Sequence, residues 1–124
     1  MSDQADVSLV RRGIINYTIV RGDTFAPPPV AFSIDGNPED FTGASLTLTI
    51  RTADRKRVLF TLTEGSGISA PATGQLQYYI SASDLEDADL PAGLYRYDVQ
   101  KDLSGVRSTI QAGTITFLNE ITVP

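Results

Sequence analysis

Apolar and polar residues alternate along most of the chain. In the segment 44–51, Ala44, Leu46, Leu48 and Ile50 share one face, and polar residues occupy the other. The same period of two recurs in further segments that end at Gly, Pro, Asn or Asp residues: 14–21, 30–34, 58–63, 75–81, 94–101, 106–110 and 114–118. About eight short strands in one chain predict an all-β fold, a single antiparallel β-sandwich.

One segment departs from this alternation. Ser83-Asp84-Leu85-Glu86 resembles a helix capping box, and Pro91 and Gly93 follow it. We therefore expect one short helical turn near 83–89. The alternation on the next strand predicts that Tyr95 and Tyr97 face the core, whereas Tyr78 and Tyr79 are adjacent, so that one of those two must point away from it.

The length of 124 residues fits one domain that can bury its own core. Residues 1–13 lack periodicity and are expected to form an N-terminal arm, and 14–124 the β-sandwich domain. The chain has no cysteine, and neither a signal peptide nor a membrane-spanning segment is evident. We expect synthesis in the cytoplasm, no disulfides and no membrane contact.

The net charge of −5 is unevenly distributed. Residues 1–62 hold seven basic and seven acidic side chains, whereas 63–124 hold three basic and eight acidic ones. Because affinity for nucleic acid depends on Lys and Arg neutralising phosphates, this balance argues against a nucleic-acid partner.

The side chains that most enzymes use are missing. The chain has no His and no Cys, so imidazole-based triads and thiol nucleophiles are impossible. Lys56 and Lys101 stand beside other charged residues at strand ends, not in the apolar setting that a nucleophilic lysine needs. We expect no enzymatic activity, no catalytic residue and no cofactor.

Two acidic groups are candidates for metal sites. Asp35, Asn37 and Glu39 have the spacing of a calcium loop, but Asp40 and Leu46 stand where that loop needs Gly and a bidentate Glu. A second group could hold a hard cation, although a solvated acidic turn is the favoured interpretation: Asp84, Glu86, Asp87 and Asp89. We expect no metal site.

A basic cluster flanks the predicted hairpin turn after 44–51. It consists of Arg51, Arg55, Lys56 and Arg57. One interpretation is a solvated loop that keeps strand edges from aggregating. The alternative is a docking tip for an acidic partner, and on that hypothesis the partner-binding residues are Arg55, Lys56 and Arg57, with Arg11 and Arg12 of the arm.

Three segments together resemble a known domain. They are Arg21-Gly22-Asp23-Thr24-Phe25, Asp40-Phe41-Thr42-Gly43-Ala44 with the strand that ends at Ile50-Arg51, and Leu90-Pro91-Ala92-Gly93-Leu94-Tyr95-Arg96-Tyr97-Asp98-Val99-Gln100. The chain is similar, over about 14–122, to the immunoglobulin-like domain near the N-terminus of baseplate upper proteins and related tail components of tailed bacteriophages. The stretch 113–122 is similar to the final strand of that domain. The resemblance implies an immunoglobulin-like sandwich of about seven to eight strands.

The resemblance also implies a role in the phage particle. In such proteins the domain precedes a fibre or receptor-binding part, and this sequence ends at Pro124. The expectation is therefore a non-enzymatic virion protein, an adaptor or decoration of the tail, baseplate, neck or capsid, present in multiple symmetric copies and bound to other virion proteins. The alternative is a carbohydrate- or receptor-binding β-sandwich module, which would present exposed aromatic side chains on one face.

Overall fold

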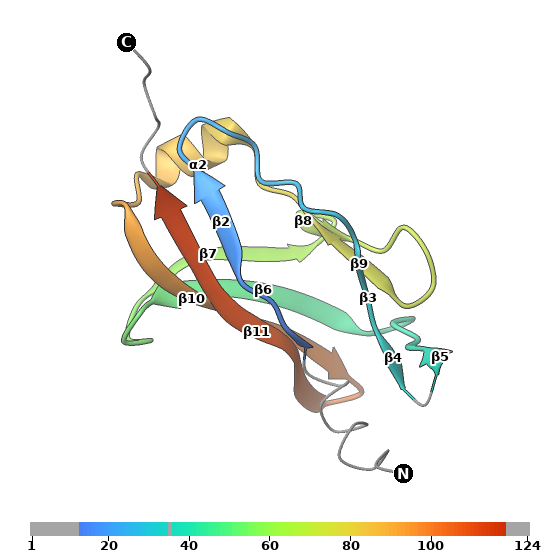
Figure 1. Ribbon diagram of the computed structural model, residues 1–124. Helices are drawn as coiled ribbons and strands as arrows, with labels where there is room; N and C mark the ends of the chain where they lie inside the picture. The colour runs from blue at the N-terminus through green and yellow to red at the C-terminus, as the bar shows by residue number, and fades with distance from the viewer. Residues whose placement is uncertain (1–12, 35, 119–124) are drawn as a thin grey trace.

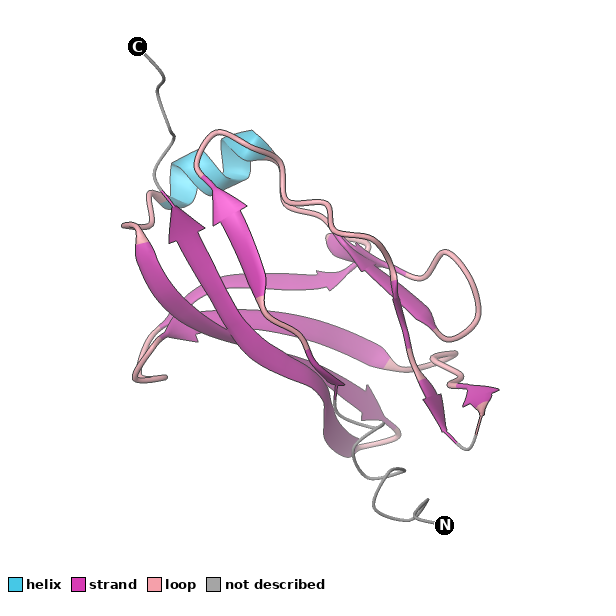
Figure 2. Ribbon diagram, in the orientation of Figure 1, coloured by secondary structure: helices cyan, strands magenta, loops and turns pink. Residues whose placement is uncertain are grey.

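The computed structural model describes residues 13–34 and 36–118. Within them the chain forms eleven strands and one short helix (Figure 2). In chain order these are β1 (Gly13–Ile14), β2 (Tyr17–Val20), β3 (Val30–Ala31), β4 (Ser33–Ile34), β5 (Asn37–Pro38), β6 (Ser45–Thr52), β7 (Val58–Glu64), β8 (Gly67–Ser69), β9 (Gln75–Tyr78), α2 (Ala82–Ala88), β10 (Gly93–Leu103) and β11 (Val106–Leu118). The all-β expectation is confirmed.

Nine of these strands form one curled sheet (Figure 1). Its hydrogen-bonded order is β1-β11-β10-β6-β7-β8-β9-β3, and β2 also pairs with β11. Most neighbours are antiparallel, but β1 and β2 run parallel to β11, and β8 runs parallel to β7. The expectation of an antiparallel fold is therefore wrong in these places. The strands β1 and β2 can pair in parallel with β11 because they are distant from it in sequence, whereas β8 meets only the end of β7, at Thr63 and Glu64.

The segment 17–31 joins the two ends of this sheet. Its first part, β2, pairs with β11 at one end, and its last part, β3, pairs with β9 at the other. Between them, Phe25 exchanges two backbone hydrogen bonds with Ile80, each of 2.9 Å. One stretch of chain thus bridges both ends of the curled sheet and covers the core.

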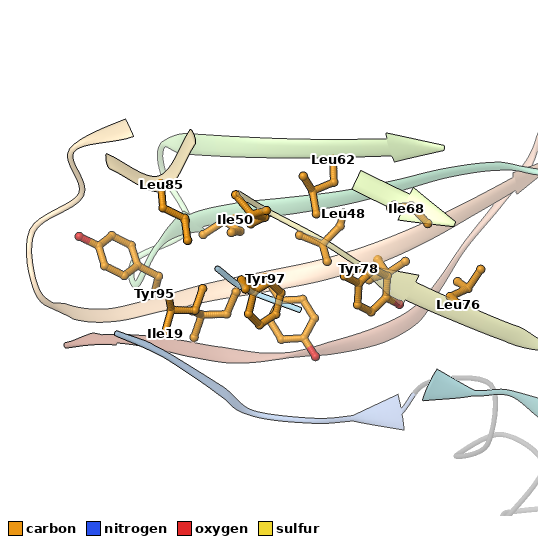
Figure 3. Packing of buried hydrophobic residues seen from close by; sticks show 14 of the residues in the cluster. Ile19, Leu48, Ile50, Leu62, Ile68, Leu76, Tyr78, Leu85, Tyr95 and Tyr97 are labelled. Atoms are coloured by element: carbon orange, nitrogen blue, oxygen red, sulfur yellow. The ribbon is translucent and has the colours of Figure 1, made fainter. Parts of the chain in front are cut away.

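The core lies on the inner face of the curl, where Figure 3 shows aliphatic and tyrosine side chains packed between the strands. On β6 the predicted alternation is confirmed, since Leu46, Leu48 and Ile50 are buried while Ser45 is exposed and Thr47 is half-buried. Tyr95 and Tyr97 are buried as expected. Burying large apolar side chains stabilises the fold by about 1.5–3 kcal/mol each.

The segments 106–110 and 114–118 are one strand, not two. Gly113 lies inside β11, and a β-bulge at Ile110 resets the alternation there, because Gln100 pairs with Thr109 while Val99 pairs with Gln111. Ile110 and Gln111 are consequently both buried. A glycine inside a strand often marks a bulge or a close backbone approach, and here it follows a bulge and allows such an approach.

Other boundaries also differ from expectation. The segment 14–21 is interrupted between β1 and β2, 30–34 is divided into two strands with different partners, and β8 was not predicted. The helix begins earlier than expected, because Ser81 rather than Ser83 is its N-cap, accepting a hydrogen bond from the Asp84 N–H at 3.1 Å. Strands of two to four residues, such as β1, β2, β3, β4 and β8, are too short to show a recognisable alternation of apolar and polar residues.

Gly113 is the position at which β11 meets the N-terminal strands most closely. A Cβ there would overlap the Ile15 carbonyl oxygen and lie 2.9 Å from Asn16 Oδ1. We expect Gly113→Ala to lower the free energy of unfolding by about 3 kcal/mol, because backbone must move to relieve the overlap. Urea unfolding of the purified chain measures this loss.

Gly93→Ala is the matched control. Gly93 has a similar φ of 148°, against 159° at Gly113, but a Cβ there meets nothing within 4 Å. Its loss should be about 1 kcal/mol, from backbone strain alone. Equal losses in the two variants would contradict the close approach at Gly113.

Candidate functional site

The first candidate is a cluster of polar side chains inside the core. Gln111 is completely buried, and its Oε1 accepts a hydrogen bond of 2.7 Å from the hydroxyl of Tyr78. Its Nε2 donates to the hydroxyls of Tyr97 at 2.8 Å and Tyr17 at 3.1 Å, and Tyr97 in turn donates to the Ile15 carbonyl at 2.7 Å. The cluster joins β2, β9, β10 and β11.

Burial keeps these phenols neutral. It raises the pKa of Tyr78 and of Tyr97 well above 10, and it also raises the pKa of Tyr17, partly offset by the hydrogen bond from Gln111. No buried polar side-chain atom in the described residues lacks a hydrogen-bond partner. Gln111, Tyr78 and Tyr97 are buried and Tyr17 is half-buried. A cluster that is satisfied internally in this way is structural, and it fixes which strands face one another.

The adjacent tyrosines point in opposite directions, as their spacing predicts. Tyr78 is fully buried, whereas Tyr79 is 52% exposed. Among the described residues Tyr79 is the one aromatic side chain in the set of exposed large hydrophobic groups. The chain therefore presents no flat row of aromatic rings over the described surface.

Two of the acidic candidate metal ligands have a structural role, and Asp35 lies outside the described residues. Glu39 is buried and forms an ion pair with Lys101, with 2.6 Å between Oε2 and Nζ, which holds the chain after β5 against β10. Asp89 is the C-cap of α2 and lies 3.6 Å from the Arg21 guanidinium. Within 13–34 and 36–118, no three acidic side chains gather as a metal site.

Three residues of the basic cluster, Arg55, Lys56 and Arg57, lie on a hydrogen-bonded turn between β6 and β7. The Asp54 carboxylate accepts a hydrogen bond from the Lys56 N–H at 2.9 Å, and the Thr52 hydroxyl accepts one from the Arg57 N–H at 3.2 Å. Hydrogen bonds from Thr52 and then Lys56 lower the pKa of Asp54. Arg55 holds a φ of 66°, and the side chains of Arg55, Lys56 and Arg57 are all exposed.

This turn borders a depression of about 280 Å³ on the outer face of the sheet. Its charged lining consists of Arg51, Arg55, Arg96 and Asp98, and Ile14, which is 75% exposed, adds an apolar contact. Three arginines against one aspartate leave a surplus of two positive charges. We call this surface the arginine depression.

The arginine depression places two like charges opposite each other on neighbouring strands. Arg51 and Arg96 are directly opposite each other on β6 and β10, an arrangement of like charges that destabilises a strand pair. Arg51 is compensated by Asp98, whose two carboxylate oxygens each lie 3.2 Å from Nη1. Arg96 donates its Nε–H to the Ala53 carbonyl at 3.1 Å and has no acidic partner among the described residues.

The structure brings together only part of the predicted site. Arg55 lines the arginine depression, Lys56 and Arg57 lie on the adjoining turn, and Arg11 and Arg12 are outside the described residues. Sequence reasoning missed Arg96, which is forty residues away from that turn along the chain. The alternation of Tyr95, Arg96 and Tyr97 did place Arg96 on the outer face, but only the β6–β10 register places it opposite Arg51.

Comparison with known proteins gave no match, either to a family model or to a curated sequence. In the part of the chain that the structure describes, no helix is sufficiently long and apolar to cross a bilayer.

The hydrogen bond to Gln111 can be tested with neighbouring tyrosines. We expect Tyr78→Phe to lower the free energy of unfolding by about 1–3 kcal/mol, because it leaves the buried Oε1 of Gln111 without its donor. Tyr79→Phe, one residue away and exposed, should change it by less than about 0.5 kcal/mol. Denaturant unfolding of both variants measures the two changes, and equal stabilities would show that the Tyr78–Gln111 hydrogen bond contributes nothing.

The buried phenols also predict an alkaline limit to stability. Their folded pKa values lie above 10 and their unfolded ones near 10, so the folded state retains protons that the unfolded state releases. Their contribution is complete below about pH 10 and falls above it by about 1.4 kcal/mol per pH unit for each phenol. Unfolding measured between about pH 8 and about pH 11.5 should show this decline, and the decline should be shallower in Tyr97→Phe.

Proposed function

We propose that this chain is a non-enzymatic structural protein of a tailed-bacteriophage particle, an immunoglobulin-like β-sandwich domain that acts through contacts with other virion proteins. The proposal rests first on the resemblance of its three sequence segments to the domain found in baseplate upper proteins. Because one fold serves many functions, the surface residues and not the fold determine what the chain contacts.

The observation that carries the proposal is the hydrogen bond from the Tyr95 hydroxyl to the Pro91 carbonyl, 2.6 Å long. A tyrosine at the start of a strand that bonds back to the backbone a few residues upstream is the tyrosine corner of immunoglobulin-like domains. Here it closes the connection from α2 to β10, and it lies inside the segment 90–100, one of the three that resemble the phage domain.

The strand order supports the same class. An immunoglobulin domain pairs its strands C, F and G in one layer and its strands B and E in the other. The order β6-β10-β11 corresponds to C, F and G, the pair β3-β9 to B and E, and β7 to strand C′ of variable-type domains, but here β8 joins the two groups into one curled sheet.

The surface favours protein contact over sugar binding. The arginine depression and the adjoining hydrogen-bonded turn offer guanidinium groups, which bind carboxylates in a bidentate geometry. A carbohydrate platform needs several coplanar aromatic rings, and of those described Tyr79 is the one exposed ring of this kind. A binding partner with acidic side chains therefore fits this chain better than a glycan does.

Particles purified from the phage that encodes the chain provide the test. We expect mass spectrometry of intact particles to detect the chain and antibody labelling in electron micrographs to mark it at a repeated position. Particles assembled with Arg55→Glu/Arg57→Glu should carry at most about a tenth as much of it, since charge reversal opposes an acidic partner. Absence of the wild-type chain from the particles, or specific glycan binding by the isolated chain, would overturn the proposal.

A further inference from the structure

We propose that the arginine depression binds the acidic face of α2 from a second copy of this chain, so that the protein self-associates through two surfaces of opposite charge. This inference rests on the proposed function, which expects several symmetric copies, and it names the partner of one contact. It adds a specific pairing of residues that can be tested in solution.

The positive surface is built to receive a carboxylate. Arg96 and Arg55 line the depression and form no ion pair among the described residues, whereas Arg51 is held by Asp98. Placing Arg96 opposite Arg51 breaks the charge rule for strand pairs, and such local violations are typical of functional sites. An incoming carboxylate would relieve that repulsion.

The negative surface is the solvent side of α2. Asp84, Glu86 and Asp87 are exposed, and none of them forms an ion pair within the described part of the chain. Leu118, which is 41% exposed, lies beside the helix, since it lines a small depression together with Leu85. Each surface thus combines charges with an exposed aliphatic side chain, Leu118 on one and Ile14 on the other.

One molecule does not bring its two surfaces together. Figure 1 shows α2 at the top of the view and the turn between β6 and β7 well below it at the left. The charges can therefore meet only between copies. A two-fold arrangement would form the contact twice, whereas a head-to-tail arrangement would form a ring or a filament.

A charge-swap experiment with the full chain tests the pairing. Sedimentation velocity at concentrations up to about 1 mM should show association at about 0.05 M salt that weakens at least tenfold at about 0.5 M, as exposed charges are screened. Arg96→Glu and Asp87→Arg should each weaken self-association about tenfold or more, because each places like charges opposite one another. Their equimolar mixture should regain association within about threefold of the wild type, since every contact again pairs opposite charges.

Arg107→Glu is the matched control. It makes the same charge change on the same sheet, at an exposed arginine of β11 outside the depression, and should alter association less than about twofold. A monomeric wild type, no recovery in the mixture, or an equal effect of Arg107→Glu would overturn the inference. Any of these outcomes leaves the proposed function standing, because detection of the chain in particles tests that separately. Circular dichroism of each variant confirms that it is folded.

Discussion

The side-chain amide of Gln111 is the interaction on which the rest of the fold depends. It accepts a hydrogen bond from Tyr78 on β9 and donates to Tyr97 on β10 and Tyr17 on β2, so strands from opposite sides of the curled sheet meet at one group. Apolar contacts tolerate sliding between layers, whereas a buried amide left without its partners costs about 1–3 kcal/mol per lost bond. The polar centre therefore selects one arrangement of the apolar core around it.

Two backbone features make that arrangement possible. The bulge at Ile110 turns Gln111 inward, and Gly113, two residues later, lets the chain at Ile15 and Asn16 lie directly on β11. Tyr97 then donates to the Ile15 carbonyl, and Thr114 N–H donates to Asn16 Oδ1 at 3.0 Å. The N-terminal strands are consequently fixed at the edge from which the segment 17–31 crosses to β3.

The interior and the outer surface are two sides of the same strands. On β10 the inward Tyr95 donates a hydrogen bond to the Pro91 carbonyl and the inward Tyr97 joins the Gln111 cluster, while the intervening Arg96 faces outward, opposite Arg51. The strands that form the core thus also set the distances between Arg51, Arg96 and Asp98 in the arginine depression. Arg55 comes from the adjoining turn, which is held by its own hydrogen bonds. Such a surface is preorganised for contact, which lowers the entropy that a partner must lose on binding.

The sequence by itself determined the elements whose signal is local. Period-two alternation predicted β6, β10 and the buried positions Leu46, Leu48, Tyr95 and Tyr97, and a cap followed by Pro and Gly predicted the helix within two residues. It also placed Arg96 on an outer face and required one of Tyr78 and Tyr79 to be exposed. These are properties of neighbours along the chain, where backbone geometry alone decides which side a residue faces.

Only the tertiary structure decided how those elements meet. Nothing near Gln111 in the sequence indicates burial, because a polar residue becomes an inner one only when a bulge shifts its strand and phenols from three other strands satisfy it. The parallel pairing of β2 with β11 and the facing of Arg96 and Arg51 depend likewise on register between distant segments. Register is fixed by packing across the whole sheet, and no local pattern contains it.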